Sequence, residues 1–398
     1  MRVTKQINLA DTPVIDNHCH PFRPVTSRLN LADLCMLLHV GPRAIEMATE
    51  DQKREWERQY VSSPPVVVPR LILELGKLYR GEQWAISHLP KEAETILEER
   101  YERVQNYAEY IKFLSDDICL RAMIVDTGFP QPPIELSTFT DEMSCKVLHI
   151  FRSESLTDRL LERGEPFSDF LTSWDSAIDE ALTDSNCLGV KSIIAYRSGL
   201  DVHKTSKKEA AINYEVYQRN GTTNLKPLLD YLFIRAMEKT IQFDKVFQVH
   251  TGMGDVDIIG EKAHPIFLLE LLKEPPFSKA KLILVHGGFP WVPEAASMVS
   301  LLPNVYMDLS VTCSLFPLRT SLRLLEALEQ APPKKILHGS DGFAIPEIMW
   351  LGGKLHKQSL ERVFSKLFEE QKISKLEGQE ISKMILYKNA ELLYGLIE

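Results

Sequence analysis

Two stretches of the sequence, Lys245-Val-Phe-Gln-Val-His250 and Lys281-Leu-Ile-Leu-Val-His286, share one pattern: a short apolar run that ends in a histidine. Short runs rich in leucine and β-branched residues are typical of strands buried on both faces of a parallel sheet. Further runs of this kind are residues 14–18, 119–125, 146–151, 189–195, 304–309 and 335–339. The sequence therefore predicts eight buried strands.

The segments between these runs carry apolar residues at three- and four-residue spacing, which predicts amphipathic helices. The predicted helices are residues 156–161, 167–182, 225–241, 265–273 and 318–331. Eight strands with intervening helices fit an α/β fold, the (β/α)8 TIM barrel. An open doubly wound sheet is the alternative, but no GxGxxG motif follows the first run, so a dinucleotide-binding version has no support.

One connection is too long for a single βα unit, because residues 21–117 separate the first two runs. The helices predicted within it are residues 29–38, 44–60, 66–78 and 92–114. Since this segment follows the C-terminal end of a strand, we expect a helical insertion that covers the barrel mouth and builds part of the pocket wall. Residues 360–397 are also predicted to be helical, so residues 1–398 are expected to form a single barrel domain with this insertion and C-terminal helices.

The composition excludes several classes of protein. With 398 residues, 44% of them apolar and 25% charged, the chain is neither disordered nor collagen-like. Its net charge of −9 and the lack of a basic block argue against a nucleic-acid or membrane-surface partner. No apolar run reaches the ~20 residues of a membrane helix, and residues 1–10 lack the apolar core of a signal peptide. Six scattered cysteines without a CxxC motif suggest reduced thiols, so we expect a cytoplasmic protein; a homo-oligomer is left open.

The first run ends in Asp16-Asn-His18-Cys-His20. Alternate side chains of a strand share a face, so His18 and His20 are expected to point the same way. Two imidazoles on one face at a strand end can hold one divalent ion. An isolated HxH motif is usually accidental, but here three later runs also end in polar groups suited to a metal.

Those later groups are His250 after the fifth run, His286 after the sixth and Asp341 after the eighth. Because the strands of a barrel converge at their C-terminal ends, we expect these three side chains to lie beside the histidine pair of the first strand. A glycine follows each of them closely, which allows a sharp turn and leaves room for a substrate.

This arrangement of HxH, two later histidines and an aspartate resembles the amidohydrolase superfamily of metal-dependent barrels. Several phrases resemble a narrower branch, the amidohydrolase-like half of fungal FluG proteins and of plant nodulin/glutamine-synthetase-like fusions. These phrases are residues 249–257, Val-His-Thr-Gly-Met-Gly-Asp-Val-Asp; residues 286–291, His-Gly-Gly-Phe-Pro-Trp; and Gly339-Ser-Asp341 with Pro346-Glu347. The resemblance extends over nearly the whole chain.

The resemblance implies that His18, His20, His250 and Asp341 bind a divalent metal. Zinc suits this nitrogen-rich set, and manganese or iron would also fit. Asp341 is the implied base for a metal-activated water, and His286 is implied either as a ligand or as a group that polarises the substrate. The implied reaction is hydrolysis of an amide or ester bond of a small molecule, with a γ-glutamyl amide suggested by the branch. A metal-dependent non-oxidative decarboxylase of a small carboxylic acid is the alternative; an inactive scaffold is disfavoured because all five residues are present.

Four further residues are candidates for this site. Many binuclear members of the superfamily use a carbamylated lysine at the end of the fourth strand as a bridging ligand, and Lys191 is the candidate. It lies early in the fourth run, so we favour a mononuclear site. The other interpretation is that Lys191 packs near the closed end of the barrel or contacts a carboxylate. Tyr196 and Arg197 are expected at the catalytic end, where the arginine would either pair with a substrate carboxylate or brace a loop. Arg23 is a candidate pocket residue.

Other polar residues are given weaker roles. Asp126, after the second run, either lines the pocket or caps the following turn. Arg152, after the third run, would bind an anion or a helix end. His149 and His338 lie within predicted strands and are expected in the core. The histidines without any spacing signal are His39, His88, His203, His264 and His356.

Overall fold

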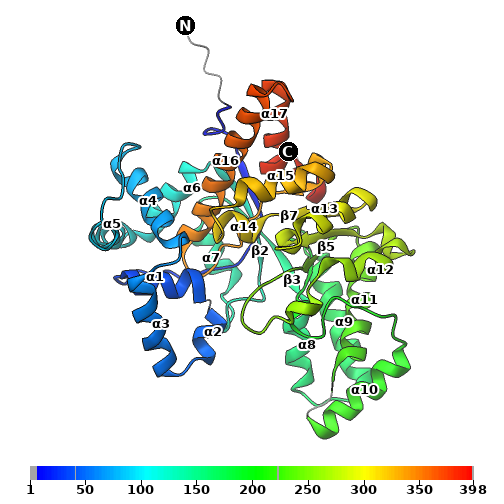
Figure 1. Cartoon of the computed structure of the whole chain (residues 1–398). Helices are drawn as coiled ribbons and strands as arrows, with labels where there is room; N and C mark the ends of the chain where they lie inside the picture. Colours follow the sequence, from blue (N-terminus) through cyan, green and yellow to red (C-terminus); the bar gives the residue numbers. More distant parts are fainter. Residues whose placement is uncertain (1–6, 41, 222–223, 397–398) are drawn as a thin grey trace.

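The computed structural model describes residues 7–40, 42–221 and 224–396. Its strands form a single eight-stranded sheet in chain order, and each strand is parallel to the next (Figure 1). The strands are β1 (Val14–Cys19), β2 (Leu120–Asp126), β3 (Lys146–Arg152), β4 (Cys187–Ser192), β5 (Val246–His250), β6 (Lys281–Val285), β7 (Val305–Asp308) and β8 (Ile336–Leu337). The predicted TIM barrel is confirmed.

The sheet is joined at its ends by hydrogen bonds between β1 and the segment after β8. The Asn17 amide donates to the His338 carbonyl at 2.9 Å, and the Asp341 amide donates to the His18 carbonyl at 2.8 Å. These bonds hold the end of the last strand beside the end of the first. As a result, Asp341 is placed next to His18 and His20.

The helices around the barrel include those predicted from periodicity. In chain order they are α7 (Leu136–Glu142), α8 (Ser153–Leu161), α9 (Phe167–Thr183), α10 (Lys207–Asn220), α11 (Lys226–Gln242), α12 (Leu269–Lys273), α13 (Val292–Leu301), α14 (Ser310–Ser314) and α15 (Thr320–Gln330). The helices α7, α10, α13 and α14 were not predicted from the sequence. Of these, α10 buries only Ala210 and Tyr214 and therefore shows little amphipathic periodicity.

The long connection after β1 is helical, as predicted. It contains α1 (Leu31–Cys35), the π-helix η1 (Met36–Val40), α2 (Pro42–Met47), α3 (Glu50–Ser62), α4 (Val67–Arg80), α5 (Leu89–Val104) and α6 (Tyr107–Asp117), drawn from blue to cyan in Figure 1. The helix predicted at 44–60 is divided, because the Thr49 hydroxyl accepts a hydrogen bond from the Gln52 amide and starts a new helix. The helix predicted at 92–114 is divided near Asn106.

The fourth strand differs from its prediction. It was expected at 189–195, but β4 ends at Ser192 and Ile194–Tyr196 forms a 3-10 turn. The Ser192 hydroxyl accepts from the Ile194 amide at 3.2 Å, which turns the chain away from the sheet. Lys191 is therefore the penultimate residue of the strand and lies at its C-terminal end. The interpretation that placed it near the closed end of the barrel is wrong.

The C-terminal helices begin earlier than predicted. They are α16 (Pro346–Glu369), α17 (Lys375–Lys383), the π-helix η8 (Met384–Lys388) and α18 (Asn389–Tyr394). Ile397, within the predicted helical tail, lies outside the described residues. Within the described ranges, none of these or the other helices combines the length and hydropathy needed to cross a membrane.

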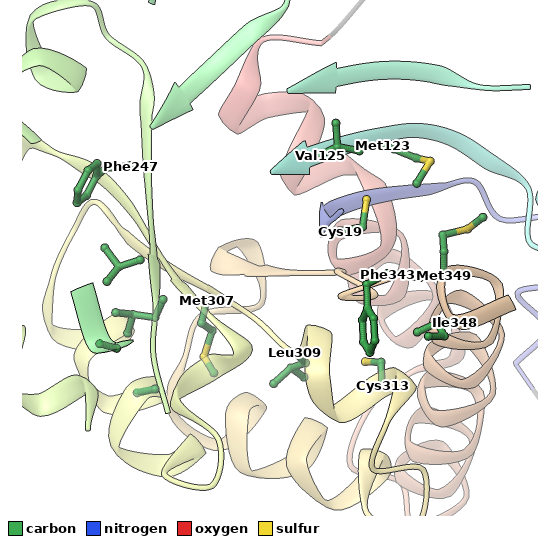
Figure 2. Packing of buried hydrophobic residues seen from close by; sticks show 14 of the residues in the cluster. Cys19, Met123, Val125, Phe247, Met307, Leu309, Cys313, Phe343, Ile348 and Met349 are labelled. Atoms are coloured by element: carbon green, nitrogen blue, oxygen red, sulfur yellow. The ribbon is translucent and has the colours of Figure 1, made fainter. Parts of the chain in front are cut away.

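The core shows the strand alternation on which the site depends. Cys19, Met123 and Val125 belong to the large apolar cluster between the strands and the helices (Figure 2). Because Cys19 faces this outer layer, its neighbours His18 and His20 face the opposite side of β1. The register of β1 against β2 shifts between Asp16 and Cys19, and at this irregular strand end both imidazoles reach the cavity inside the barrel.

Candidate active site

A cavity of about 710 Å³ lies at the C-terminal ends of the strands. The residues that line it include most of those singled out in the sequence: His18, His20, Lys191, Tyr196, Arg197, His250, His286 and Asp341. His39, Val40 and Glu46 of the helical insertion also contribute to its wall. Side chains separated by more than 300 positions in the chain thus share one chamber, as expected where barrel strands converge.

The metal-binding candidates of β1 converge on Asp341. Its Oδ1 lies 3.5 Å from Nε2 of His18 and 3.5 Å from Nε2 of His20. One ligand atom each of His18, His286 and Asp341 also lies within 4.8 Å of the other two. Imidazole nitrogens and a carboxylate oxygen grouped in this way are a typical donor set for zinc and similar divalent ions.

Gln248 fixes the orientation of His18. The Gln248 side-chain amide donates to the Asn17 carbonyl at 3.0 Å, so its oxygen faces His18 Nδ1, also at 3.0 Å. That oxygen can only accept, so Nδ1 carries the proton and Nε2 presents its lone pair to the cavity. The sequence analysis missed Gln248. Its signal is a polar residue within an apolar strand, two positions before His250 and therefore on the same face.

A second hydrogen-bonded series orients His286. Asp308 Oδ1 accepts from the Ser310 hydroxyl at 2.7 Å and from the His286 amide at 2.9 Å. Because the serine proton is directed to Asp308, the serine oxygen accepts from His286 Nδ1, also at 2.7 Å. His286 Nε2 consequently bears a lone pair and accepts from His250 Nδ1 at 3.1 Å. His250 Nε2 is then left as a buried acceptor without a partner among the described residues.

Two of these residues have an uncommon backbone conformation. The φ angles of His286 and Asp341 are +68° and +54°, in the left-handed region. Non-glycine residues in this region are uncommon, and such strain often occurs at functional sites. Both residues are held in place by hydrogen bonds. The His286 backbone amide donates to Asp308, and the Asp341 backbone amide donates to the His18 carbonyl.

Burial sets the charge of this group. It lowers the pKa of His286 to about 3, and it lowers the pKa of His250 well below the usual value. Burial alone would raise the pKa of Asp341, but the neighbouring imidazoles, His286 first among them, hold it well below the usual range. Near neutral pH the site therefore offers uncharged imidazoles and an ionised carboxylate, the forms that bind a cation.

Lys191 is part of the same buried group. Its Nζ lies 3.2 Å from His18 Nε2, and its side chain is inaccessible to solvent. Burial lowers the pKa of Lys191 to about 8, although the Asp126 carboxylate opposes this shift. At pH 7 about a tenth of the amine is therefore uncharged.

Tyr196 and Arg197 lie on the cavity wall, as expected from their place after β4. The Tyr196 hydroxyl accepts from the Asp255 amide at 3.1 Å, and its ring centroid is 4.5 Å from that of His250. Arg197 pairs with Asp158 at 3.1 Å. Of the two interpretations of Arg197, this contact favours bracing of the rim.

The expectation that Arg23 is a pocket residue is wrong. Its exposed guanidinium donates to the Pro132 carbonyl at 2.7 Å, and it is not among the residues that line the cavity. Arg152 does line the cavity, but its guanidinium is occupied by Asp126 through bonds of 3.1 Å and 2.5 Å and by the Gly128 carbonyl. Asp126 and Arg152 thus form a buried ion pair that supports the wall beneath the histidines.

The sequence profile of the family described as Amidohydrolase matches residues 208–396. Residues 208–396 are therefore similar to the amidohydrolase family. This match covers the part of the amidohydrolase barrel that carries His250, His286 and Asp341. The resemblance inferred from the sequence is confirmed, and the superfamily is metal-dependent.

Comparison with individual proteins agrees with this assignment. Protein fluG of Emericella nidulans is 28% identical over 314 residues, which are 70% of this chain and 36% of that protein. The chain therefore spans about a third of the length of this relative. A metal-dependent hydrolase structure from Lactobacillus casei superposes with a TM-score of 0.80 at 24% identity over 98% of both chains. A uronate isomerase from Thermotoga maritima gives 0.67 at 15% identity, also over 98% of both. These two structures show that the fold is shared.

The donor set fits a divalent cation. Imidazole lone pairs of His18 and His250 and the Asp341 carboxylate face one chamber, and the buried Nε2 of His250 has no partner. An unpartnered buried acceptor is unfavourable by about 1–3 kcal/mol, a cost that a bound cation would remove.

Proposed function

We propose that the protein is a metal-dependent hydrolase that cleaves an amide or ester bond of a small molecule. The observation that carries this proposal is the position of Asp341, whose Oδ1 is 3.5 Å from Nε2 of both His18 and His20 within the cavity. His18, His20, His250 and Asp341 would hold the ion, for which zinc is the best match to the nitrogen-rich donors. A divalent ion there would polarise the substrate carbonyl and lower the pKa of water.

Asp341 is the proposed general base. Its ionised oxygen accepts a proton from the attacking water and then delivers that proton to the leaving group. His286 has its Nδ1 proton bound to Ser310 and a lone pair at Nε2, so it has no N–H to offer a substrate carbonyl. Of its two implied roles, this tautomer favours ligation or positioning of His250 over polarisation of the substrate.

The cavity wall favours a substrate that is itself charged. Arg159 on α8 lines the wall, and its guanidinium has no ion-pair or hydrogen-bond partner within the described ranges. Asp255 and Asp257 also line it. An unpaired guanidinium is suited to a carboxylate, and loop carboxylates are suited to an amine. A γ-glutamyl amide carries both groups next to a hydrolysable bond, and we propose this substrate class.

The number of metal ions depends on Lys191. The sequence favours a mononuclear site only because Lys191 lies early in its apolar run. In the structure Lys191 lies at the end of β4, and its Nζ is 3.2 Å from His18 Nε2. We therefore retain Lys191 as a candidate bridging ligand in a carbamylated form. Two ions per chain at this site would support that role, and one ion would support the mononuclear alternative.

We also propose that the insertion at 21–117 covers the mouth of the barrel, since three of its residues line the cavity.

The test is turnover by metal-loaded and chelator-treated protein. The substrates are γ-glutamyl amides, matched amides without the α-carboxylate or the amine, esters and small aromatic acids. We expect metal-dependent release of the carboxylic acid, with γ-glutamyl amides preferred. Release of carbon dioxide without any hydrolysis would support the decarboxylase alternative and contradict the proposal.

A further inference from the structure

A second cluster of metal-binding side chains lies away from the cavity. It consists of Cys313 on α14, His338 directly after β8 and His356 on α16, and none of the three lines the cavity. Their exposed fractions are 0%, 1% and 0%. One potential ligand atom of each lies within 4.8 Å of the other two. Figure 2 shows Cys313 in the buried layer between the strands and the outer helices.

The two histidines of this cluster satisfy each other only in part. Their Nδ1 atoms are 2.9 Å apart, so one ring donates and the other accepts. His356 Nε2 is buried and has no hydrogen-bond partner in the part of the chain that the structure describes. Three buried groups that can each ligate a metal therefore lie together: a free thiol and two imidazoles in contact through their Nδ1 atoms.

We propose that Cys313, His338 and His356 bind a structural zinc ion. A thiolate with two imidazoles is a soft, nitrogen-rich donor set that zinc prefers, whereas calcium and magnesium require oxygen. On binding, the Cys313 S–H bond gives way to an S–Zn bond and the proton leaves to solvent, with no change of oxidation state.

The two imidazoles need only a small adjustment to share one ion. Two nitrogens bound to one tetrahedral zinc at about 2.0–2.1 Å lie about 3.3 Å apart, so the two rings would separate by about 0.4 Å. Burial already keeps both imidazoles uncharged, since it lowers the pKa of His356 to about 4 and that of His338 well below its usual value. Both rings therefore keep a lone pair available at neutral pH.

The cluster lies close in sequence to residues of the active site. Cys313 follows Ser310 by three residues, and Asp341 follows His338 by three residues. A zinc ion at this cluster would therefore cross-link α14, the end of β8 and α16. These segments carry the serine that orients His286 and the proposed base, so the ion would stiffen the support of the active site.

Zinc-edge X-ray absorption of the wild-type protein, loaded with zinc and freed of excess metal, tests the proposal. The catalytic donors include no thiol, so a sulfur neighbour at about 2.3 Å from zinc is expected only from this cluster. A coordination shell of nitrogen and oxygen alone would overturn the proposal, and this measurement requires no variant.

Matched variants locate the sulfur. Cys313→Ser should lose the sulfur signal and about one zinc per chain, whereas Cys187→Ser, at a cysteine that is equally buried in β4, should retain both. If Cys313→Ser does not fold, His356→Gln provides the same comparison of zinc content. Persistence of the sulfur signal in folded Cys313→Ser would refute the assignment.

The outcome is separable from the proposed hydrolase activity. His18→Ala/His20→Ala should lose the catalytic ion and keep the sulfur-bound zinc. If instead that variant loses the sulfur signal while Cys313→Ser keeps it, the zinc assigned to this cluster belongs elsewhere and the inference is wrong.

Discussion

Ser310→Ala removes the hydroxyl that connects His286 to Asp308. In the wild type this oxygen lies 2.7 Å from His286 Nδ1 and 2.7 Å from Asp308 Oδ1. Without it, the buried Nδ1–H of His286 has no acceptor, and nothing selects the tautomer whose Nε2 lone pair faces His250. We expect the free energy of unfolding to fall and zinc binding at the catalytic site to weaken.

Both magnitudes can be bounded. One buried donor left unpaired is unfavourable by about 1–3 kcal/mol. Loss of a residue that orients a metal-binding histidine typically reduces affinity about 10–100-fold, which is about 1.4–2.8 kcal/mol. Ser310→Thr keeps a hydroxyl and should restore most of both quantities. The matched control is Ser314→Ala: Ser314 is buried one turn later in α14, and its hydroxyl donates to the Ser310 carbonyl at 3.3 Å without contacting His286.

Zinc affinity by competition with a chromogenic chelator, and unfolding by denaturant titration, measure the two effects on the same preparations. Ser314→Ala should be destabilised to a smaller extent and keep its affinity for the catalytic ion. A folded Ser310→Ala protein whose zinc affinity is within about twofold of wild type would refute the role assigned to this serine.

Three further predictions concern the metal, the base and the buried ion pair. His18→Ala/His20→Ala should abolish stoichiometric metal at the catalytic site, and full metal content by mass spectrometry would contradict the ligand assignment. Asp341→Asn should keep much of the metal while kcat falls about 10²–10⁴-fold, because the amide offers an oxygen but takes no proton; turnover near the wild-type rate would place the base elsewhere. Burial alone would raise the pKa of Asp126, but Arg152 holds it below its usual range. The ionised carboxylate therefore stabilises the folded protein at pH values above the ordinary carboxyl pKa of about 3.9. That stabilisation is lost as the pH falls below this value. Thermal unfolding between about pH 5 and 2 should show this loss, and Asp126→Asn should flatten the dependence.

The sequence alone determined the barrel and the residues at its mouth. Strands buried on both faces must be apolar throughout, so their runs are visible without an alignment, and a polar residue at the end of such a run is conspicuous. His18, His20, His250, His286 and Asp341 were found in this way, because strand alternation and the convergence of barrel strands are general properties of the backbone.

Strand ends were less predictable from the sequence. The apolar run that contains β4 continues through Ile194 and Ala195, but the hydroxyl of Ser192 binds the Ile194 amide and ends the strand. This local hydrogen bond competes with the sheet and has no signature in hydropathy. The position of Lys191 relative to His18 could therefore be read only from the folded chain.

Other groups were decided by tertiary structure alone. The hydrogen-bonded series Asp308–Ser310–His286 joins the end of β7 to the end of β6. The second cluster combines a short helix, a strand end and a long helix, which carry Cys313, His338 and His356. Such groups have no fixed spacing in the sequence, because their contacts depend on how the outer helices pack against the barrel. Strand periodicity specifies the face on which a side chain lies, whereas hydrogen-bond partners and ligand sets are fixed only when distant segments meet.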